Sequence, residues 1–425
     1  MTALRSSAVP SSRASRTPAA RPPRWLAPRD VLLHSSGVSA LDGTFVIDLS
    51  SVRSGPTCTK ILADFGAEVV RVERPGSDRD RVFFDQADLH RNKRSIVLDL
   101  QNPRGVELLR TLAARSDVIV ENYRPDVKHR LGVDYETLAR DNPRLVYASI
   151  SGFGQDGPYR ERPGYDQIVQ GMSGLMWLTG SEETAPLRIG IPIADLLAGY
   201  FCAMGILVAL IDRERSGRGQ YVSTSLLEAL VGSLSFQAVK YLNTGEVPPP
   251  VGNHHPLTAP MGVYRAQDGF MNLAVGNDDM WARLCRTLGL AELIDDPRLA
   301  KNAARLKHRA EMDRILTERL VTRPVAEWIE AMNRAGVACG PIAKVDQVFA
   351  DAQVQRAGLV HEHEHAAYGP VKVLGLPVHL SRTPPTVRSA APVAGADTRS
   401  VLERFGYTPA DIDALAEAGV IEVVK

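Results

Sequence analysis

The sequence has almost no net charge, few cysteines and no hydrophobic segment of membrane-spanning length. Its 425 residues carry 50 basic and 49 acidic side chains, a formal charge of +1. This balance gives no global electrostatic attraction to nucleic acid or to an anionic membrane. Hydrophobic and charged contents of 44% and 23% are ordinary for a soluble globular protein. We therefore expect neither a nucleic-acid nor a membrane partner.

Cysteine usage argues against a disulfide framework and against a zinc site. The four cysteines, Cys58, Cys202, Cys285 and Cys339, lie far apart in the chain and form no C-x-x-C pair. Such spacing fits free thiols in a reducing compartment. We expect a cytoplasmic protein without a bound metal.

The longest uncharged apolar stretch is Leu196–Ile211, which has 16 residues. A membrane span needs about 20 such residues. Asp195 and Arg213 bracket the stretch, and Gly199 and Gly205 interrupt it. The pattern predicts a buried helix.

The first 40 residues differ from the rest in composition. They contain six arginines and one acid, a charge of +5, and are rich in Ser, Ala and Pro. We interpret residues 1–40 as a disordered extension. A targeting peptide is the alternative, but the prolines would break an amphipathic helix, which favours a plain tail or a start codon placed too early.

Short apolar runs alternate with helical patterns from residue 44 to residue 150. The runs are Thr44–Ser50, Glu68–Glu73, Ser95–Leu100, Asp117–Glu121 and Leu145–Ile150. Pro56–Phe65 has the pattern of a helix that ends at Gly66, and Asn102-Pro103 marks the start of another helix. The alternation predicts a parallel sheet with helices on both faces. No G-x-G-x-x-G follows the first run, which argues against a dinucleotide site of the usual kind.

The second half of the chain differs from the first in composition and in the order of its expected helices and strands. Residues 243–259 are rich in Pro, Gly and Asn, and two apolar runs then flank Asp268-Gly269, which is a hairpin signal. Helices are expected around 279–289, 303–322 and 324–335, short strands from about 360 (VKVLG and PVHLS), and a last helix at Thr408-Pro409 with Asp411 in a capping-box pattern. We predict an α/β fold in which a Rossmann-like large domain, built from the N- and C-terminal segments, carries a smaller inserted α+β domain. The predicted boundaries are 41–235 for the first part of the large domain, 236–259 for a linker, 260–340 for the small domain, 341–360 for a second linker and 361–425 for the C-terminal return.

Asp195 is the first candidate for chemistry. This carboxylate lies in an apolar run at the predicted start of a helix. One interpretation is a helix N-cap, which free N–H groups and the helix dipole favour. The other is a carboxylate nucleophile in a site that excludes water.

The loop at residues 51–56 and a set of cations are further candidates for binding. The loop follows the first predicted strand, where parallel sheets bind ligands, although an ordinary βα turn fits equally well. If the sheet is parallel, the cations near its strand ends converge on one edge and suit a polyanionic ligand, although solvated surface charge is the default for each. They are Arg71, Arg74, Lys93, Arg94, Arg124 and Arg130.

A histidine-rich segment invites comparison with metal sites. In residues 361–365 (HEHEH), alternation places three histidines on one face of a strand. No further ligand cluster accompanies them in the sequence, so a solvated edge strand is the favoured interpretation. The sequence contains no G-x-S-x-G elbow, no Walker loop and no zinc-protease motif.

Eight segments together resemble the family III CoA-transferases, the CaiB/BaiF type that includes formyl-CoA transferase and carnitine CoA-transferase. They are DLSSVRSGPTCTKILADFGAEVVRVERPG (48–76), NKRSIVLDL (92–100), DVIVENYRP (117–125), GFGQDGPYRERPGYDQIVQGMSGLM (152–176), GIPIADLLAG (190–199), SGRGQYVSTSLLEA (216–229), GVACGPI (336–342) and GYTPADIDALAEAGVI (406–421). The resemblance covers about residues 41–423.

The resemblance implies an enzyme that moves CoA between an acyl-CoA thioester and a free carboxylate through aspartyl anhydride and aspartyl-CoA thioester intermediates. It implies Asp195 as the nucleophile, coenzyme A as substrate and no metal. The implied CoA contacts are Val52, Arg53, Ser54, Arg74, Leu98, Asn122, Tyr123 and Arg130. It further implies an interlocked homodimer, and succinyl-CoA is a donor that is common in the family.

The same scaffold also carries α-methylacyl-CoA racemases, which are the alternative function. Racemases use a His in a G-H-D motif, whereas this chain has Gly164-Tyr165-Asp166. Tyrosine titrates near 10 and is a poor proton-exchange partner at neutral pH. Asp278 and Asp279 lie near the place of the racemases' second carboxylate without matching its motif. Arg53 stands where formyl-CoA transferases have glutamine, so a substrate larger than oxalate or formate is expected.

Overall fold

Seven strands form the central sheet of the computed structural model, which describes residues 39–77 and 83–424. The predicted disordered extension falls almost wholly outside the described residues and stays a prediction. The strand order is β12-β3-β2-β1-β4-β5-β6. The strands are β1 Phe45–Asp48, β2 Glu68–Glu73, β3 Lys93–Leu98, β4 Val118–Glu121, β5 Val146–Ser151, β6 Tyr221–Ser225 and β12 Ile421–Glu422.

All neighbouring strands of this sheet are parallel except β12, which pairs antiparallel with β3. Ile421 lies opposite Leu98, so the end of the chain returns to the edge of a sheet that begins at residue 45. The mixed α/β fold with a mostly parallel sheet is confirmed.

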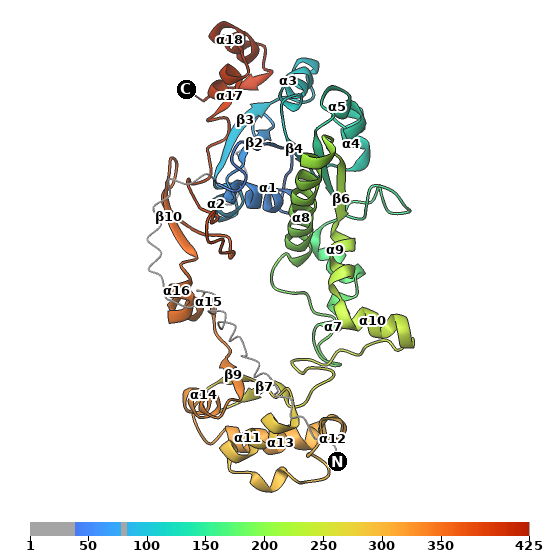
Figure 1. Ribbon diagram of the computed structural model, residues 1–425, viewed down its shortest axis with the longest axis vertical. Helices are drawn as coiled ribbons and strands as arrows, with labels where there is room; N and C mark the ends of the chain where they lie inside the picture. Colours follow the sequence, from blue (N-terminus) through green and yellow to red (C-terminus); the bar gives the residue numbers. More distant parts are fainter. Residues whose placement is uncertain (1–38, 78–82, 425) are drawn as a thin grey trace, which may run out of the picture. The chain divides into compact units, whose positions relative to one another are not determined.

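Alternate residues of each strand pack into two hydrophobic cores, one on each face of the sheet. Val46 and Val69 contribute to a core shared with helices α1 (Ser54–Asp64) and α8 (Ile193–Ser216). Phe45 and Ile47 contribute to the opposite core, which includes residues of α3 (Pro103–Ala113) and of the C-terminal helices. Figure 1 shows α1 and α8 side by side, and the two helices contact each other closely.

The other helices of this part of the chain connect the strands or follow them. They are α2 Phe83–His90, α4 Pro125–Leu131, α5 Tyr135–Asp141, α6 Asp166–Met172, α7 Leu175–Leu178, α9 Leu226–Ser233, α10 Ser235–Thr244, α17 Thr398–Arg404 and α18 Pro409–Glu417. Asn102 accepts a hydrogen bond from the Arg104 N–H at the start of α3, and Thr408 and Asp411 form the expected capping box of α18. Local sequence signals therefore place these helix starts correctly.

A separate antiparallel sheet, with the order β7-β8-β9, has its own hydrophobic core. Its strands are β7 Met261–Arg265, β8 Phe270–Ala274 and β9 Ala338–Pro341, and the hairpin around Asp268-Gly269 is confirmed. The helices between β8 and β9 are α11 Asp278–Leu288, the 3₁₀ helix η1 Ala291–Leu293, α12 Asn302–Lys307, α13 Arg309–Leu320 and α14 Val325–Arg334. The expected helix 303–322 is therefore two helices, with a break at His308.

The segment that follows contains two short helices and a hairpin. They are α15 Val345–Ala350, α16 Ala352–Ala357, β10 Val360–His365 and β11 Gly369–Leu374. The expected strand in PVHLS (377–381) is wrong, because these residues form no strand. The predicted linkers 236–259 and 341–360 contain α10, α15 and α16, and the predicted domain boundaries stay predictions.

Helix α8 is longer and less buried than its sequence indicates. Ala198, Cys202 and Ile206 are buried, but Val208 and Ile211 are about 65% exposed. The prediction of a buried helix is therefore right for one face and wrong for the other. By length and composition α8 could also cross a membrane, which is a weak indication because core helices meet the same criterion.

Candidate active site

The loop between β1 and α1 lies beside the loop that follows β4. The Ser51 N–H donates to Asn122 Oδ1 at 2.9 Å, and Asn122 Nδ2 donates to the Ser51 carbonyl at 2.7 Å. Val52 follows with a φ of 62° and is 65% exposed. A β-branched residue rarely adopts this left-handed conformation, so the loop holds Val52 outward at a conformational cost. Parallel strands thus bring two predicted CoA-binding loops together at one edge.

A buried ionic network lies beneath this loop. Asp48 Oδ1 accepts hydrogen bonds from the Ser50 N–H, at 3.0 Å, and from the Ser50 hydroxyl. Its Oδ2 accepts from Thr59 Oγ1 at 2.6 Å and from Lys93 Nζ at 2.9 Å. Burial lowers the pKa of Lys93 to about 8, although Asp48 opposes the shift. The network anchors the first residues of the loop to the sheet.

Asp195 lies in the first turn of α8 but does not cap it. The helix begins at Ile193 after Pro192, and a carboxylate of another helix, Asp166, accepts the Ala194 N–H at 2.8 Å. The interpretation of Asp195 as an N-cap is therefore wrong. Within residues 39–77 and 83–424, the Asp195 carboxylate has no hydrogen-bond or ion-pair partner.

The environment of Asp195 makes this carboxyl group more basic than usual. Burial and the negative charge of Asp166 raise its pKa to about 6, against an opposing effect of Arg53. The carboxylate nevertheless remains about 90% ionised at pH 7. A half-buried, unpartnered carboxylate of raised basicity has the properties that a nucleophile needs.

A cavity of about 310 Å³ brings most of the predicted site together. Val52, Ser54, Asn122 and Tyr123 line it together with Asp195. Val52 belongs to the β1–α1 loop and Ser54 to the start of α1. Asn122 and Tyr123 belong to the β4–α4 loop, and Asp195 lies at the start of α8. This arrangement places the candidate nucleophile in the same cavity as four predicted CoA contacts.

Four predicted contacts do not line the cavity. Arg53 contacts Asp85 and lies 3.8 Å from Asp88, although its charge still acts on Asp195. Arg74 is exposed after β2, and Arg130 is exposed on α4 with Asp126 at 3.7 Å. Leu98 is only 1% exposed and belongs to a hydrophobic core. Their contacts with CoA stay predictions.

Sequence reasoning assigned no role to Arg160 and Arg162 of this cavity, whereas it named Arg124 as a candidate cation and Tyr165 as the residue at the racemases' His position. Arg160, Arg162 and Tyr165 belong to the segment after β5, and Arg124 precedes α4. The guanidinium of Arg162 lies 3.8 Å from the centroid of the Tyr159 ring. The sequence did contain a signal for these residues, because residues 152–176 belong to the quoted family segments. Their spacing in the sequence alone does not show that they lie near Asp195.

The expectation that six cations converge on one edge is wrong for Lys93 and Arg94, and of the other four Arg124 alone lines the cavity. Lys93 and Arg94 begin β3 and therefore lie at the amino end of a parallel strand. Lys93 is buried against Asp48, and Arg94 lies 3.2 Å from Glu68. Both are held by carboxylates of the chain.

The histidine segment forms strand β10, as expected, and its three histidines share the less exposed face. His365 packs against Tyr368, and its Nδ1 accepts the Ala367 N–H at 3.1 Å. These histidines are not among the groups whose ligand atoms converge in the described part of the chain.

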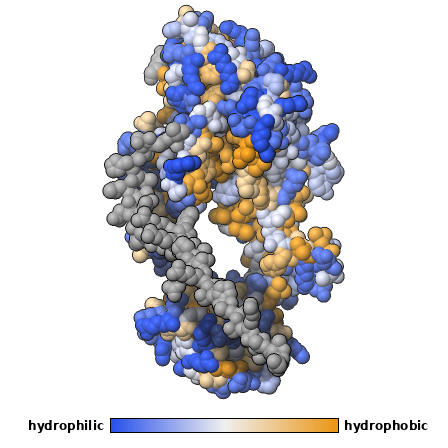
Figure 2. Space-filling model, in the orientation of Figure 1, coloured by the Kyte–Doolittle hydropathy of each residue, from blue (hydrophilic) through white to orange (hydrophobic). Residues whose placement is uncertain are grey.

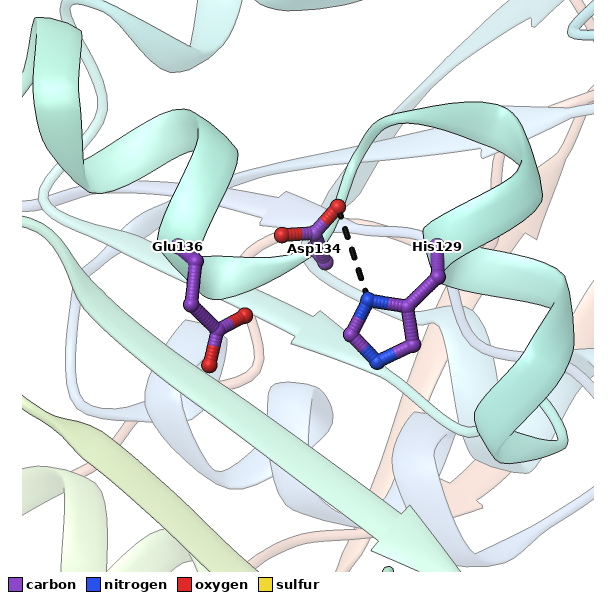
Figure 3. A group of neighbouring side chains, drawn as sticks. All are labelled: His129, Asp134 and Glu136. Atoms are coloured by element: carbon purple, nitrogen blue, oxygen red, sulfur yellow. Dashed lines mark ion pairs between the residues drawn. The ribbon is translucent and has the colours of Figure 1, made fainter.

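Among residues 39–77 and 83–424, one group with converging ligand atoms is found, made by His129, Asp134 and Glu136 (Figure 3). Asp134 caps α5, because its two oxygens accept from the Thr137 N–H and the Thr137 hydroxyl, each at 3.0 Å. The His129 Nδ1 lies 3.7 Å away from Asp134 Oδ2 (Figure 3). Helix capping accounts for this carboxylate without a metal.

Comparison with known proteins identifies the group to which this geometry belongs. Residues 41–398 match the model of CoA-transferase family III. Succinate–glutarate CoA-transferase of Agrobacterium fabrum is 39% identical over 378 residues, which cover 85% of this chain and 94% of that protein. Succinyl-CoA:glutarate CoA-transferase of Mus musculus is 36% identical over 393 residues, 90% of each chain.

A solved structure shows the same fold. The crystal structure of a CaiB/BaiF family protein from Brucella suis has a TM-score of 0.78 and 35% identity, and the match covers 86% of this chain and 99% of that one. The family model, the relatives and the solved structure each cover most of this chain. The chain therefore belongs to CoA-transferase family III, and it is a CoA-transferase enzyme that uses a CoA thioester as substrate.

Proposed function

We propose that Asp195 is the nucleophile that carries CoA transfer. Its carboxylate attacks the thioester carbonyl of a donor acyl-CoA, which forms an aspartyl anhydride and releases CoA thiolate. The thiolate then attacks the aspartyl carbonyl of this anhydride, which frees the donor as a carboxylate and leaves an aspartyl-CoA thioester. The acceptor carboxylate attacks that thioester to form a second anhydride and thiolate. Attack of the thiolate on the acceptor's acyl carbon yields the new acyl-CoA and regenerates Asp195.

The observation that carries this proposal is the unpartnered Asp195 carboxylate in the cavity lined by Val52, Ser54, Asn122 and Tyr123. Its pKa of about 6 combines ionisation at pH 7 with raised basicity. One thioester forms for each one that breaks, so the reaction requires no ATP, and the aspartate mechanism assigns no step to a metal. Exclusion of water from the cavity would protect the anhydride from hydrolysis.

The remaining predicted residues are assigned to CoA binding. Val52, Ser54, Asn122 and Tyr123 would contact the part of CoA nearest the thioester, because they share the cavity with Asp195. Arg74 and Arg130 are exposed and would suit the phosphates. Arg53 is engaged with Asp85, so its role would be to steady the loop and moderate the charge near Asp195.

The proposed substrates are succinyl-CoA as donor and a dicarboxylate of the glutarate class as acceptor. The names of the Agrobacterium fabrum and Mus musculus relatives join succinate or succinyl-CoA with glutarate. Arg124, Arg160 and Arg162 line the cavity, where guanidinium groups suit the second carboxylate of such substrates. The names of these two relatives favour a dicarboxylate longer than oxalate, and the arginines favour a substrate with a second carboxylate over formate.

Racemisation of an α-methylacyl-CoA is the alternative, and the site gives it less support. Tyr165 lines the cavity where racemases have His, and a phenol is a weak acid at neutral pH. Asp278 is bound by Arg305 at 2.9 Å and by Lys301 at 3.2 Å, which occupies this carboxylate. Deuterium exchange into the α-carbon without an acceptor carboxylate would favour the racemase.

The exposed apolar side of α8 and α10 supports a homodimer, which we propose to be interlocked around the predicted inserted domain. Val208, Ile211, Val239 and Leu242 are 58% to 76% exposed. Figure 2 shows hydrophobic surface in this part of the molecule. Exposed apolar side chains on two helices are typical of an interaction surface, and a second copy is the occupant that the family pattern suggests. We assign the enzyme to the cytoplasm because its cysteines are free.

Substitution of the nucleophile tests the proposal. Asp195→Asn keeps the shape of the side chain and removes the attacking oxygen anion, so transfer from succinyl-CoA to glutarate should fall by at least about 10³-fold. Asp42→Asn is the matched control, because Asp42 is exposed at the amino end of β1, opposite the cavity. Its rate, followed by chromatography of the CoA esters, should equal that of the wild type. An Asp195→Asn enzyme of near-normal activity would overturn the assignment.

A further inference from the structure

Helix α6 holds the chain that leads into Asp195. Asp166, its first residue, accepts the Ala194 N–H through Oδ1 at 2.8 Å. Because Ala194 directly precedes Asp195, this hydrogen bond fixes the backbone from which the candidate nucleophile projects. The helix itself offers no cap of its own, since Pro192 stands at the N-cap position.

Gln170, one turn further along α6, completes this clamp. Its Oε1 accepts the Ile189 N–H at 2.9 Å, and its Nε2 donates to the Ile191 carbonyl at 3.3 Å. The same Nε2 donates to Asp166 Oδ2 at 2.8 Å. The segment 189–194 is therefore held at three backbone groups by two side chains of one helix.

Asp166 also acts on Asp195 through its charge. It is 7% exposed, and its charge raises the pKa of Asp195, second only to burial itself. Two cations oppose this effect. Arg188 Nη2 lies 3.7 Å from Asp166 Oδ2, and the charge of Arg53 acts directly on Asp195.

The other charged groups near Asp195 lie across the cavity. Arg124, Arg160 and Arg162 line the cavity wall, and Tyr165 and Tyr123 are the titratable phenols there. Of these groups, none is a carboxylate. Among the described residues that line the cavity or bond to the start of α8, Asp166 is thus the one negative charge beside the nucleophile.

We propose that Asp166 is a positioning residue of this active site, which fixes the first turn of α8 and, as a second buried negative charge, makes the Asp195 carboxylate a stronger nucleophile. The inference rests on the proposed role of Asp195. A carboxylate beside a like charge is more basic, and nucleophilic reactivity rises with basicity. Asp166 is 29 positions before Asp195 in the sequence and lies on a different helix.

Asp166→Asn separates the two roles. Asparagine keeps an oxygen that accepts the Ala194 N–H, but it carries no charge and no longer accepts the hydrogen bond from Gln170 Nε2. The acid limb of kcat/KM against pH should move to lower pH by about one unit, and kcat at pH 7.5 should fall about three-fold for a Brønsted slope near 0.5. The KM for acyl-CoA should stay within about two-fold, because the CoA contacts are untouched.

Arg188→Gln is the companion variant with the opposite sign. It removes the cation that partly neutralises Asp166, so the acid limb should move to higher pH while the α6–α8 hydrogen bonds remain. A purely structural role for Asp166 predicts no opposed shifts in these two variants. Arg188→Gln also keeps the proposal testable if Asp166→Asn fails to fold.

The outcomes separate this inference from the proposed function. If Asp195→Asn is inactive but the acid limb of Asp166→Asn or of a folded Arg188→Gln stays at the wild-type pH, the positioning role of Asp166 is refuted and the nucleophile stands. If Asp195→Asn remains active, the proposed function itself fails. Opposed shifts of the two limbs would support both.

Discussion

The close contact between α1 and α8 predicts a specific effect for Gly199→Ala. Gly199 lies on the buried side of α8, one turn after Asp195. A Cβ at this position would lie 2.7 Å from the Ser54 carbonyl oxygen and 2.9 Å from Cβ and Cγ2 of Thr57. Real side chains do not approach so closely, and the first obstacle is backbone. The two helices must therefore separate by several tenths of an ångström.

The expected loss of stability is the balance of two effects. Overpacking of a filled core costs about 1–3 kcal/mol. Replacing glycine by alanine inside a helix returns about 1 kcal/mol. The net free energy of unfolding should fall by up to about 2 kcal/mol, which lowers Tm by a few degrees in a chain of this size.

The effect on catalysis should exceed the effect on stability. Ser54 and Asp195 line the same cavity from α1 and α8, so separation of the helices moves the CoA contacts away from the nucleophile. A displacement of about 1 Å can cost about 10²-fold in rate, and half of that displacement predicts about a tenfold loss of kcat/KM.

Thermal unfolding and steady-state transfer kinetics measure both quantities. Gly232→Ala is the control for stability, because it lies in α9 and its Cβ would meet nothing within 4 Å in the single chain. Its Tm should equal or exceed that of the wild type. A Gly199→Ala enzyme with wild-type Tm and wild-type kcat/KM would refute the argument that this glycine sets the spacing of the two helices.

Three further predictions concern other parts of the molecule. Because Asp195 has a pKa of about 6 and must be ionised to attack, kcat/KM should be half-maximal near pH 6 and fall about tenfold per unit below it; a limb near pH 4 would contradict this. Lys93→Met leaves Asp48 buried without its cation and should cost about 3–5 kcal/mol in chemical denaturation, with partial recovery on adding Asp48→Asn, whereas equal stability of all three proteins would refute the network. Leu242→Asp on the exposed face of α10 should weaken the proposed dimer in sedimentation or light scattering, and an unchanged mass would place the interface elsewhere.

Much of the parallel sheet could be predicted from local patterns. The run Glu68–Glu73 coincides with β2, and Asn102-Pro103 marks the start of α3. These signals are local, because an apolar run and a capping residue determine the backbone conformation within a few positions of the chain. The strand β3 begins two residues earlier than expected. Its first residue, Lys93, is buried only because Asp48 pairs with it from another strand, and no hydropathy pattern shows such a pair.

The site was predictable only where a family pattern pointed to it. Position and burial alone left Asp195 open between a cap and a nucleophile. The choice against the cap depends on the contact of Asp166 with Ala194, which is made across 28 positions of sequence. The exposure of one side of α8 was not predicted for a related reason. The sequence of an apolar helix face has the same pattern whether the same chain or another molecule covers it.

Identification of the covalent intermediate tests the central claim most directly. The enzyme would be mixed with succinyl-CoA in the presence of hydroxylamine, which converts an aspartyl anhydride or thioester into an aspartyl hydroxamate, and then analysed by peptide mass spectrometry. The account predicts a hydroxamate at Asp195 that appears only with the acyl-CoA. Modification of a different carboxylate, or none at all in an enzyme that transfers CoA normally, would contradict it.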